Sequence, residues 1–121
     1  MESGHAEPRY DLEERTYQFA RRVRKFIKLV PRTVSNFEDG KQVIKSSGSV
    51  GANYIEANES LGNKDFLLHI KISRKEAKES HYWLRLLDLD AKPEFEPERQ
   101  ALLQEADELT RIFGAIVRKK S

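Results

Sequence analysis

The middle of the chain reads Ser46-Ser47-Gly48-Ser49-Val50-Gly51-Ala52-Asn53-Tyr54-Ile55-Glu56-Ala57. This stretch is rich in small residues, yet it keeps helical spacing and shows no sustained alternation, so a helix is favoured over a strand. Each glycine in a helix interior costs about 1 kcal/mol relative to alanine. Gly48 and Gly51 therefore predict a close approach to another helix, which offsets that cost, and we expect this neighbour to be the next helix along the chain.

Four segments carry apolar residues at spacings of three and four, which is typical of amphipathic helices. They predict helices over about residues 11–30, 36–58, 64–89 and 97–117. Pro31 ends the first helix, because the residue before a proline is pushed out of the α region. The sequence Ser35-Asn36-Phe37-Glu38 resembles a capping box at the start of the second helix.

The connections between these segments are short, and short connections favour antiparallel neighbours. The predicted fold class is therefore all-α: an up-down-up-down four-helix bundle over residues 11–119, after a disordered lead over residues 1–10. Heptad spacing also predicts a left-handed bundle with helices crossing at about 20°.

The third predicted helix carries apolar residues on two nearly opposite faces. One face belongs to the bundle core. The other face carries Leu68, Ile72, Trp83 and Leu86. A contiguous apolar patch of this kind is uncommon on a soluble monomer. We therefore expect an oligomer interface anchored by Trp83, since tryptophan dominates interface hot spots.

Composition limits the classes of protein to which the chain can belong. The 121 residues suit one domain. The absence of cysteine excludes disulfide scaffolds and thiolate chemistry. No apolar run approaches the roughly 20 residues of a membrane span, so we expect no membrane partner and a cytoplasmic location.

Charge is distributed unevenly along the chain. Residues 15–45 contain nine Lys or Arg against two acids, and residues 88–108 contain eight acids against two Lys or Arg. Such asymmetry indicates either an anionic partner or two regions that face each other, within one chain or between subunits.

The strongest functional signal is a set of cations at spacings of four, three and four. This basic stripe consists of Arg21, Lys25, Lys28 and Arg32. A row of cations on one side of a helix can follow the phosphates of RNA or DNA. A solvated helix face explains the same pattern without a partner, and neither zinc-finger spacing nor an aromatic-glycine signature for RNA is present.

No catalytic or metal-binding pattern is found. A di-iron bundle site requires Glu three residues before His, whereas Phe66 precedes His69 and Lys78 precedes His81 at that spacing. Ser49 and Gly51 match half of a nucleophile elbow, but Ser47 stands in place of its first glycine and the strand-turn-helix context is missing. We therefore expect no catalytic residue, no metal and no cofactor.

Asn53 and Glu56 share one face of the second predicted helix and, with Gly48 and Gly51, form its structural motif. A buried carboxylate needs a partner. We expect Arg74 or Lys75 of the third helix to pair with Glu56, in a structural rather than a catalytic role.

The stretch from Ser49 to Ala57 resembles the motif of the bacterial four-helix-bundle proteins called 23S rRNA intervening-sequence proteins. Further along, Asp65-Phe66, the run Lys75-Glu76-Ala77-Lys78-Glu79 and Tyr82-Trp83-Leu84 are similar to the third helix of the same family. The resemblance covers roughly residues 12–116. Many members end the central motif with Glu-Gly, where this chain has Glu56-Ala57.

This resemblance implies a left-handed antiparallel bundle that assembles as a homopentamer. A related branch is the accessory variability protein of diversity-generating retroelements, a basic pentamer that works with a reverse transcriptase and nucleic acid. The family contributes no catalytic residues.

We therefore predict a non-enzymatic, self-assembling helical bundle that serves as a scaffold, with RNA or DNA as the candidate partner. The alternative is a protein-interaction adaptor with no nucleic-acid role, whose basic and acidic surfaces meet protein partners. An enzyme is a distant third hypothesis.

Overall fold

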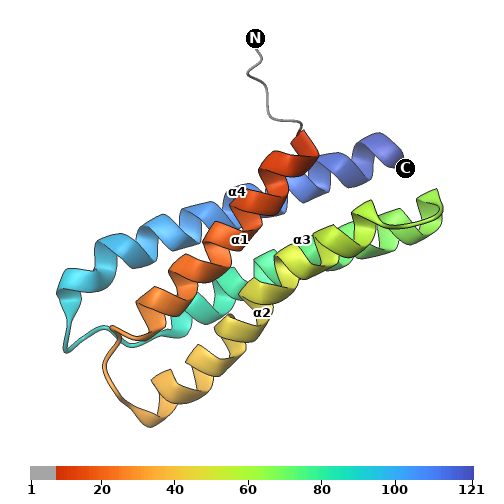
Figure 1. Ribbon diagram of the computed structural model, residues 1–121. Helices are drawn as coiled ribbons and strands as arrows, with labels where there is room; N and C mark the ends of the chain where they lie inside the picture. Colours follow the sequence, from red (N-terminus) through yellow and green to blue (C-terminus); the bar gives the residue numbers. More distant parts are fainter. Residues whose placement is uncertain (1–7) are drawn as a thin grey trace.

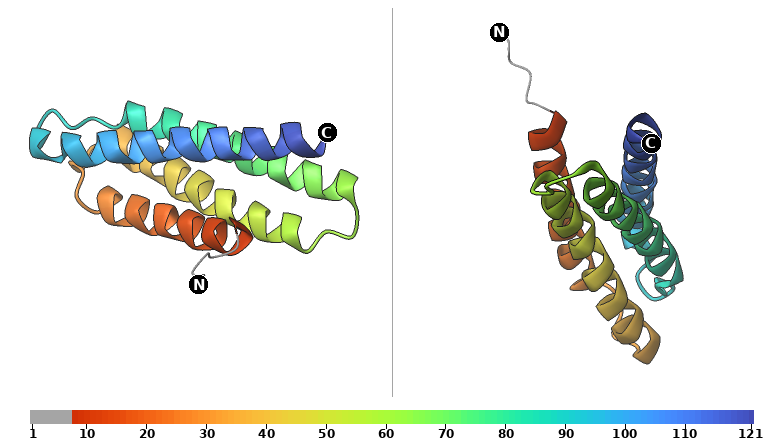
Figure 2. Two further views of the ribbon diagram at one scale, coloured as in Figure 1. Left: turned by 90° about the horizontal axis from the view of Figure 1, so that it is seen from above. Right: turned by 90° about the vertical axis from the view of Figure 1, so that its right-hand side faces the viewer.

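The computed structural model describes residues 8–121, and the side chains of residues 12–121. It contains α1 (Pro8–Ile27), α2 (Val34–Asn58), α3 (Asn63–Leu86), the short 3₁₀ helix η1 (Pro93–Phe95) and α4 (Glu96–Lys120). Successive long helices run in opposite directions (Figures 1 and 2). The predicted all-α, up-down-up-down four-helix bundle is confirmed.

Two helices end earlier than the sequence pattern suggests. α1 ends at Ile27 and α3 at Leu86, although Val30, Leu87 and Leu89 beyond them are buried in the core. A periodic apolar pattern indicates which residues are buried, but it does not show that they are helical. It therefore continues into the connections, whose apolar residues also cover the core. α1 begins at Pro8, within the lead expected to be disordered, and residues 1–7 lie outside the described residues.

The core is built from the predicted heptad stripes. Its completely buried aromatic side chains are Phe19, Phe26 and Phe113. Around them lie the buried aliphatic residues Val23, Val43, Val50, Ile70, Leu84, Leu102 and Leu109. α2 packs most extensively against α3, and α3 against α4, whereas the contact between α1 and α4 is the smallest between neighbouring long helices.

The start of α2 differs from the predicted capping box. Thr33 is the N-cap, and its hydroxyl accepts a hydrogen bond from the Asn36 amide at 3.0 Å. The Asn36 side chain is buried and donates to the carbonyls of Pro31 and Asp88, each at 2.9 Å, while its Oδ1 accepts from the Asp88 amide at 2.8 Å. Asn36 therefore joins the two connections at this end of the bundle.

Small residues allow α2 to approach both of its neighbours. A Cβ at Gly51 would lie 2.8 Å from Thr16 Oγ1, so α1 passes directly over this glycine. The buried Ser46 hydroxyl hydrogen bonds to that of Ser80 at 2.8 Å, and Ser73 donates to the Val50 carbonyl at 2.9 Å, which joins α2 to α3. The predicted close approach at Gly51 is confirmed, but the neighbour is α1 rather than α3.

Candidate nucleic-acid interface

All four residues of the basic stripe are exposed, but they do not share one helix face. Arg21 and Lys25 lie on α1, Lys28 lies in the turn after its last residue, and Arg32 lies in the connection to α2. The expectation of a single helical row is therefore wrong, because α1 ends before Lys28. The connection instead places Arg32 beside α2, where it lines a hollow that also contains Phe37.

Other cations of α1 are paired with the acidic helix α4. Arg15 Nε donates to Glu105 at 2.7 Å and Arg15 Nη2 to Glu108 at 2.7 Å, while Arg22 Nε lies 3.5 Å from Glu98. The hydrogen bond to Glu105, assisted by that to Glu108, raises the pKa of Arg15 further above its usual value. For Arg15 and Arg22, the uneven distribution of charge along the sequence is therefore explained by a basic and an acidic region that face each other within the chain.

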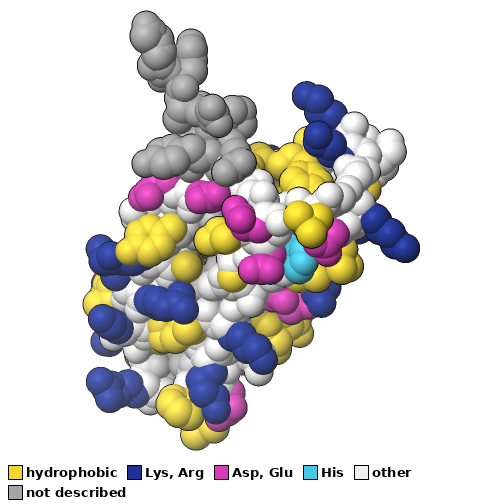
Figure 3. Space-filling view, turned by 45° about the vertical axis from the view of Figure 1, so that its right-hand side comes forward, with side chains coloured by type: hydrophobic (Ala, Val, Ile, Leu, Met, Phe, Trp, Pro, Cys, Tyr) yellow, Lys and Arg dark blue, Asp and Glu magenta, His cyan; other side chains and the backbone are white. Residues whose placement is uncertain are grey.

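Within residues 12–121, the basic stripe has no such partners. Arg21 donates to the Tyr17 hydroxyl at 3.2 Å, and this hydrogen bond raises the pKa of Arg21. Among the described side chains, no carboxylate lies in ion-pair range of Arg21, Lys25, Lys28 or Arg32. In Figure 3 the lower part of the surface carries dark blue cationic side chains interspersed with yellow apolar ones.

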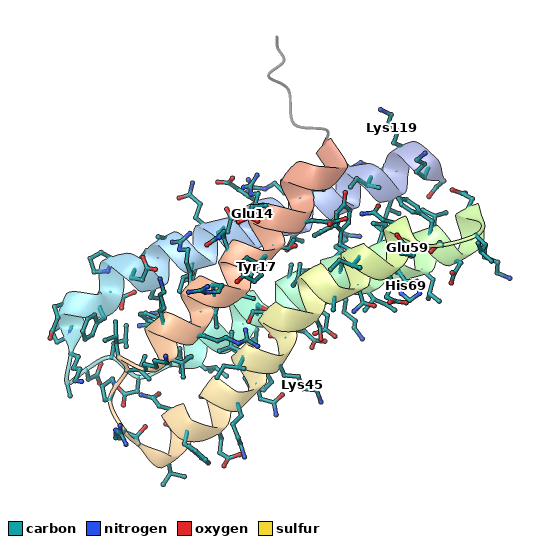
Figure 4. The ribbon with its side chains drawn as sticks, in the orientation of Figure 1. Glu14, Tyr17, Lys45, Glu59, His69 and Lys119 are labelled. Carbon is teal, nitrogen blue, oxygen red and sulfur yellow. The ribbon has the colours of Figure 1, made fainter. Side chains whose placement is uncertain are left out.

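Two hollows lie next to the basic stripe, on the side of the bundle formed by α1, α2 and the connection between them. This side is named here the α1–α2 face. The first, named here the Tyr17 hollow, has a volume of about 360 Å³. Its lining residues are Glu13, Thr16, Tyr17, Ala20, Arg21, Arg24, Gly48, Gly51, Ala52 and Ile55. Small residues of both helices contribute to its lining. The Tyr17 side chain is 51% exposed and projects from α1 (Figure 4).

The second hollow, named here the Phe37 hollow, lies where α1 turns into α2 and has a volume of about 380 Å³. Phe37 is 66% exposed, and the Lys41 ammonium lies 5.0 Å from the centre of its ring. Lys28 and Arg32 also line this hollow. The Lys41 ammonium lies 3.4 Å from Glu38, so Lys28 and Arg32 are the two cations here that carry no ion pair among the described residues.

The second apolar face of α3, named here the α3 stripe and formed by Leu68, Ile72, Trp83 and Leu86, is only partly exposed. Leu68 and Leu86 are 53% and 46% exposed, whereas Ile72 and Trp83 are half-buried. Trp83 packs against the core and makes an edge contact with the exposed Tyr82, with ring centres 5.2 Å apart. The α3 stripe is therefore less exposed than expected, because Ile72 and Trp83 are half-buried and Trp83 packs against the core.

The structural motif of α2 is divided between its two neighbours. Gly48 lies under the Arg24 guanidinium of α1, while Asn53 faces α3, where its Oδ1 lies 3.3 Å from His69 Nδ1. Figure 4 shows His69 near the end of the bundle where α2 turns into α3. Glu56 is exposed and has no ion pair with Arg74 or Lys75, so the expected network around Glu56 is not present.

The arrangement of these helices and the sequence together place the chain in a family. A family model described as 23S rRNA-intervening sequence protein matches residues 9–115. The chain belongs to this family. Its central motif and its third helix, which suggested the resemblance, both lie within the matched region.

A solved structure supports the same assignment. The chain described here is similar to a protein of unknown function from the S23 ribosomal protein family of Bacteroides thetaiotaomicron VPI-5482, with 25% sequence identity and a TM-score of 0.78. The similarity covers 91% of this chain and 97% of the solved one. No curated protein matches the chain. Neither match concerns the accessory variability protein, so that relation stays a prediction.

The matches name no enzymatic activity, and the solved relative has no known function. Within residues 12–121, no three His, Asp or Glu side chains lie together in a way that could hold a metal ion. No helix of residues 8–121 combines the length and apolar character that a membrane span requires. Among the features of this family member, the unpaired cations beside the two hollows are therefore the best candidate for a functional surface.

Proposed function

We propose that this protein is a non-enzymatic, self-assembling helical scaffold that binds nucleic acid through the α1–α2 face. The observation that carries the proposal is the contrast between two sets of cations on one segment. Arg15 and Arg22 are neutralised by α4, whereas Arg21, Lys25 and Lys28 have no carboxylate partner among the described residues.

Unpaired cations favour a polyanionic ligand for a simple reason. Each Lys or Arg that neutralises a phosphate releases a condensed counterion, and this release drives binding at low salt. A charge already paired within the protein contributes less, because binding a phosphate would first require the existing pair to break. The cations of the basic stripe have no ion pair among the described residues, so they can bind a phosphate without first breaking one.

Self-assembly is proposed through the α3 stripe. The exposed Leu68 and Leu86 support this part of the proposal, and the half-buried Ile72 and Trp83 add partly exposed apolar surface. A closed ring uses heterologous contacts, so the α3 stripe would meet a different surface of the next subunit. The family resemblance supplies the number five. Several copies of a weak phosphate site would then act together, provided that their spacing allows simultaneous binding.

The test is a triple charge reversal, Arg21→Glu with Lys25→Glu and Lys28→Glu. Retention of labelled RNA and DNA on a filter at low salt is measured for the parent and the variant. We expect the parent to retain nucleic acid and the variant to lose retention. The fold should persist, since all three side chains are exposed.

A matched variant controls for net charge. Lys64, Lys78 and Lys119 are exposed on α3 and α4, and their reversal to Glu changes the net charge by the same amount. This control should keep most of the retention. Equal losses in both triple variants, or no retention by the parent, would exclude the α1–α2 face as the binding surface. If the parent protein retained no nucleic acid but co-purified with a protein partner, the alternative hypothesis of a protein-interaction adaptor would be favoured.

A further inference from the structure

We propose that the ligand of the α1–α2 face is a single-stranded nucleic acid, with bases stacked on Tyr17 and Phe37 and phosphates held by the basic stripe. This inference rests on the proposed function and adds to it the strandedness of the ligand and two aromatic contact residues. Tyr17 comes from α1 and Phe37 from α2, so no linear sequence signature contains both.

The first argument is the exposure of the two rings. Tyr17 and Phe37 are 51% and 66% exposed, although the other aromatic residues of α1 and α2 with described side chains are buried in the core. Each ring borders a hollow into which a flat group can fit. Single-strand binding proteins present aromatic side chains in this way, because every base has a π-face that can stack on them.

The second argument is the cation beside each ring. The Arg21 guanidinium lies 5.9 Å from the centre of the Tyr17 ring, and the Lys41 ammonium lies 5.0 Å from that of Phe37. A base stacked on Tyr17 would therefore carry its phosphate close to Arg21. At Phe37, where Lys41 is paired with Glu38, the phosphate would meet the unpaired Lys28 and Arg32 that line the same hollow. The Tyr17 hollow also contains Glu13, whose Oε2 accepts a hydrogen bond from Asn58 at 3.2 Å. Because this carboxylate would repel a phosphate, the phosphates of a bound strand should lie on the Arg21 side of the hollow and not near the start of α1.

The third argument is distance along the face. Tyr17 and Lys28 are eleven positions apart, which corresponds to about 16 Å at the 1.5 Å rise of a helix. A stacked strand advances about 3.4 Å per nucleotide, so this separation spans about five nucleotides. Lys25 lies on the exposed side of α1 between these two positions. A strand of about five nucleotides can therefore reach both hollows while its phosphates follow the basic stripe.

Other ligands fit these features less well. The bases of a duplex are stacked and paired inside the helix, so a duplex could use the cations but not the exposed rings. A lipid surface would require a continuous apolar helix face. The apolar stripe of α2, formed by Val43, Val50 and Tyr54, is buried in the bundle core.

The experiment compares alanine variants with variants that keep the ring. Fluorescence anisotropy is measured with a labelled oligothymidylate of about twelve nucleotides and with a duplex of the same length. Phe37→Ala and Tyr17→Ala should each weaken binding of the single strand about 5- to 150-fold and leave duplex binding unchanged. Phe37→Tyr and Tyr17→Phe keep the ring and should bind like the parent. Both positions are exposed, so the fold should be unaffected.

The outcomes separate this inference from the proposed function. Equal binding of single strand and duplex, unchanged in both alanine variants, would overturn the stacking inference and leave the basic stripe as a phosphate-binding surface. No salt-dependent binding of either probe would overturn both. Binding to phosphatidylserine vesicles that Phe37→Ala abolishes, with oligothymidylate binding unchanged, would assign the Phe37 hollow to lipid and overturn the inference.

Discussion

Replacement of Gly51 by alanine tests whether α1 lies as close to α2 as the structure indicates. The new Cβ would lie 2.8 Å from Thr16 Oγ1 and 3.1 Å from Thr16 Cβ. Thr16 is completely buried, and its hydroxyl already donates to the Leu12 carbonyl at 2.8 Å. A rotation of the Thr16 side chain would break this hydrogen bond and would leave the contact with Thr16 Cβ in place, so Thr16 or the helix that carries it must shift.

The magnitude follows from two opposing effects. Overpacking a well-packed core costs about 1–3 kcal/mol, and the rigid, doubly contacted site at Thr16 favours the upper half of that range. Replacing a helical glycine by alanine gains about 1 kcal/mol. We therefore expect Gly51→Ala to lower the free energy of unfolding by about 1–2 kcal/mol. Gly51→Leu adds further atoms to the same contact and should destabilise more strongly.

Gly48→Ala is the matched control, one turn away on the same helix. Its Cβ would meet only the Arg24 Nη2 atom, at 3.3 Å, and this is the end of a flexible and exposed side chain. We expect this variant to be neutral or up to about 1 kcal/mol more stable than the parent. The two variants should therefore differ by about 2 kcal/mol, or roughly 8 °C in Tm for a chain of this size.

The assay is urea unfolding followed by circular dichroism, at one protein concentration because any self-assembly contributes to apparent stability. In a Thr16→Ala background the closest atom is removed, and the cost of Gly51→Ala should fall by about 1 kcal/mol. Equal stability of the Gly51→Ala and Gly48→Ala variants, or no coupling to Thr16, would refute the proposed contact between α1 and α2.

Three further predictions concern other parts of the bundle. Leu68→Asp with Leu86→Asp should give a smaller species than the parent by light scattering, with helicity preserved; a parent that is already monomeric at micromolar concentration would contradict self-assembly. Asn36→Ala should cost about 2–3 kcal/mol in urea unfolding, since it leaves buried backbone groups unsatisfied, and a change below about 0.5 kcal/mol would show that this side chain does not join the connections. Hydrogen bonds from Arg99 and Gln100 lower the pKa of Glu96 to about 2, so the stability that its carboxylate contributes is present above pH 4.5 and is lost as the pH falls toward about 2. Glu96→Gln should remove this loss, and an unchanged pH dependence of Tm would argue against the pair.

The helical core could be predicted from the sequence because burial follows a local period. Phe19, Val23 and Phe26 show this on α1, since their spacing alone places them on one side of a helix, and all three are buried. Helix ends were less predictable. Val30 satisfies the same period but lies beyond the last residue of α1, because the chain leaves the helix while it still covers the core.

Features that depend on distant residues could not be read from the sequence. Asn36 was interpreted as part of a capping box, yet its partner Asp88 lies 52 positions away. The partner of Gly51 was expected on α3 and lies on α1, because glycine carries no side-chain pattern that indicates its neighbour. Likewise, the basic stripe was visible as a spacing, but the two hollows beside it require Tyr17 and Phe37 to be brought to one face by the fold.

The most direct test of the proposed nucleic-acid role is the salt dependence of oligothymidylate binding by the parent and by the triple variant Arg21→Gln, Lys25→Gln and Lys28→Gln. A plot of the logarithm of the binding constant against that of the salt concentration should be linear, with a slope of about −0.7 for each phosphate that is neutralised on a single strand. Loss of three such contacts should reduce the steepness of the slope by about 2. The same slope in both proteins, or no measurable binding by the parent at low salt, would contradict a phosphate-binding role for these three residues.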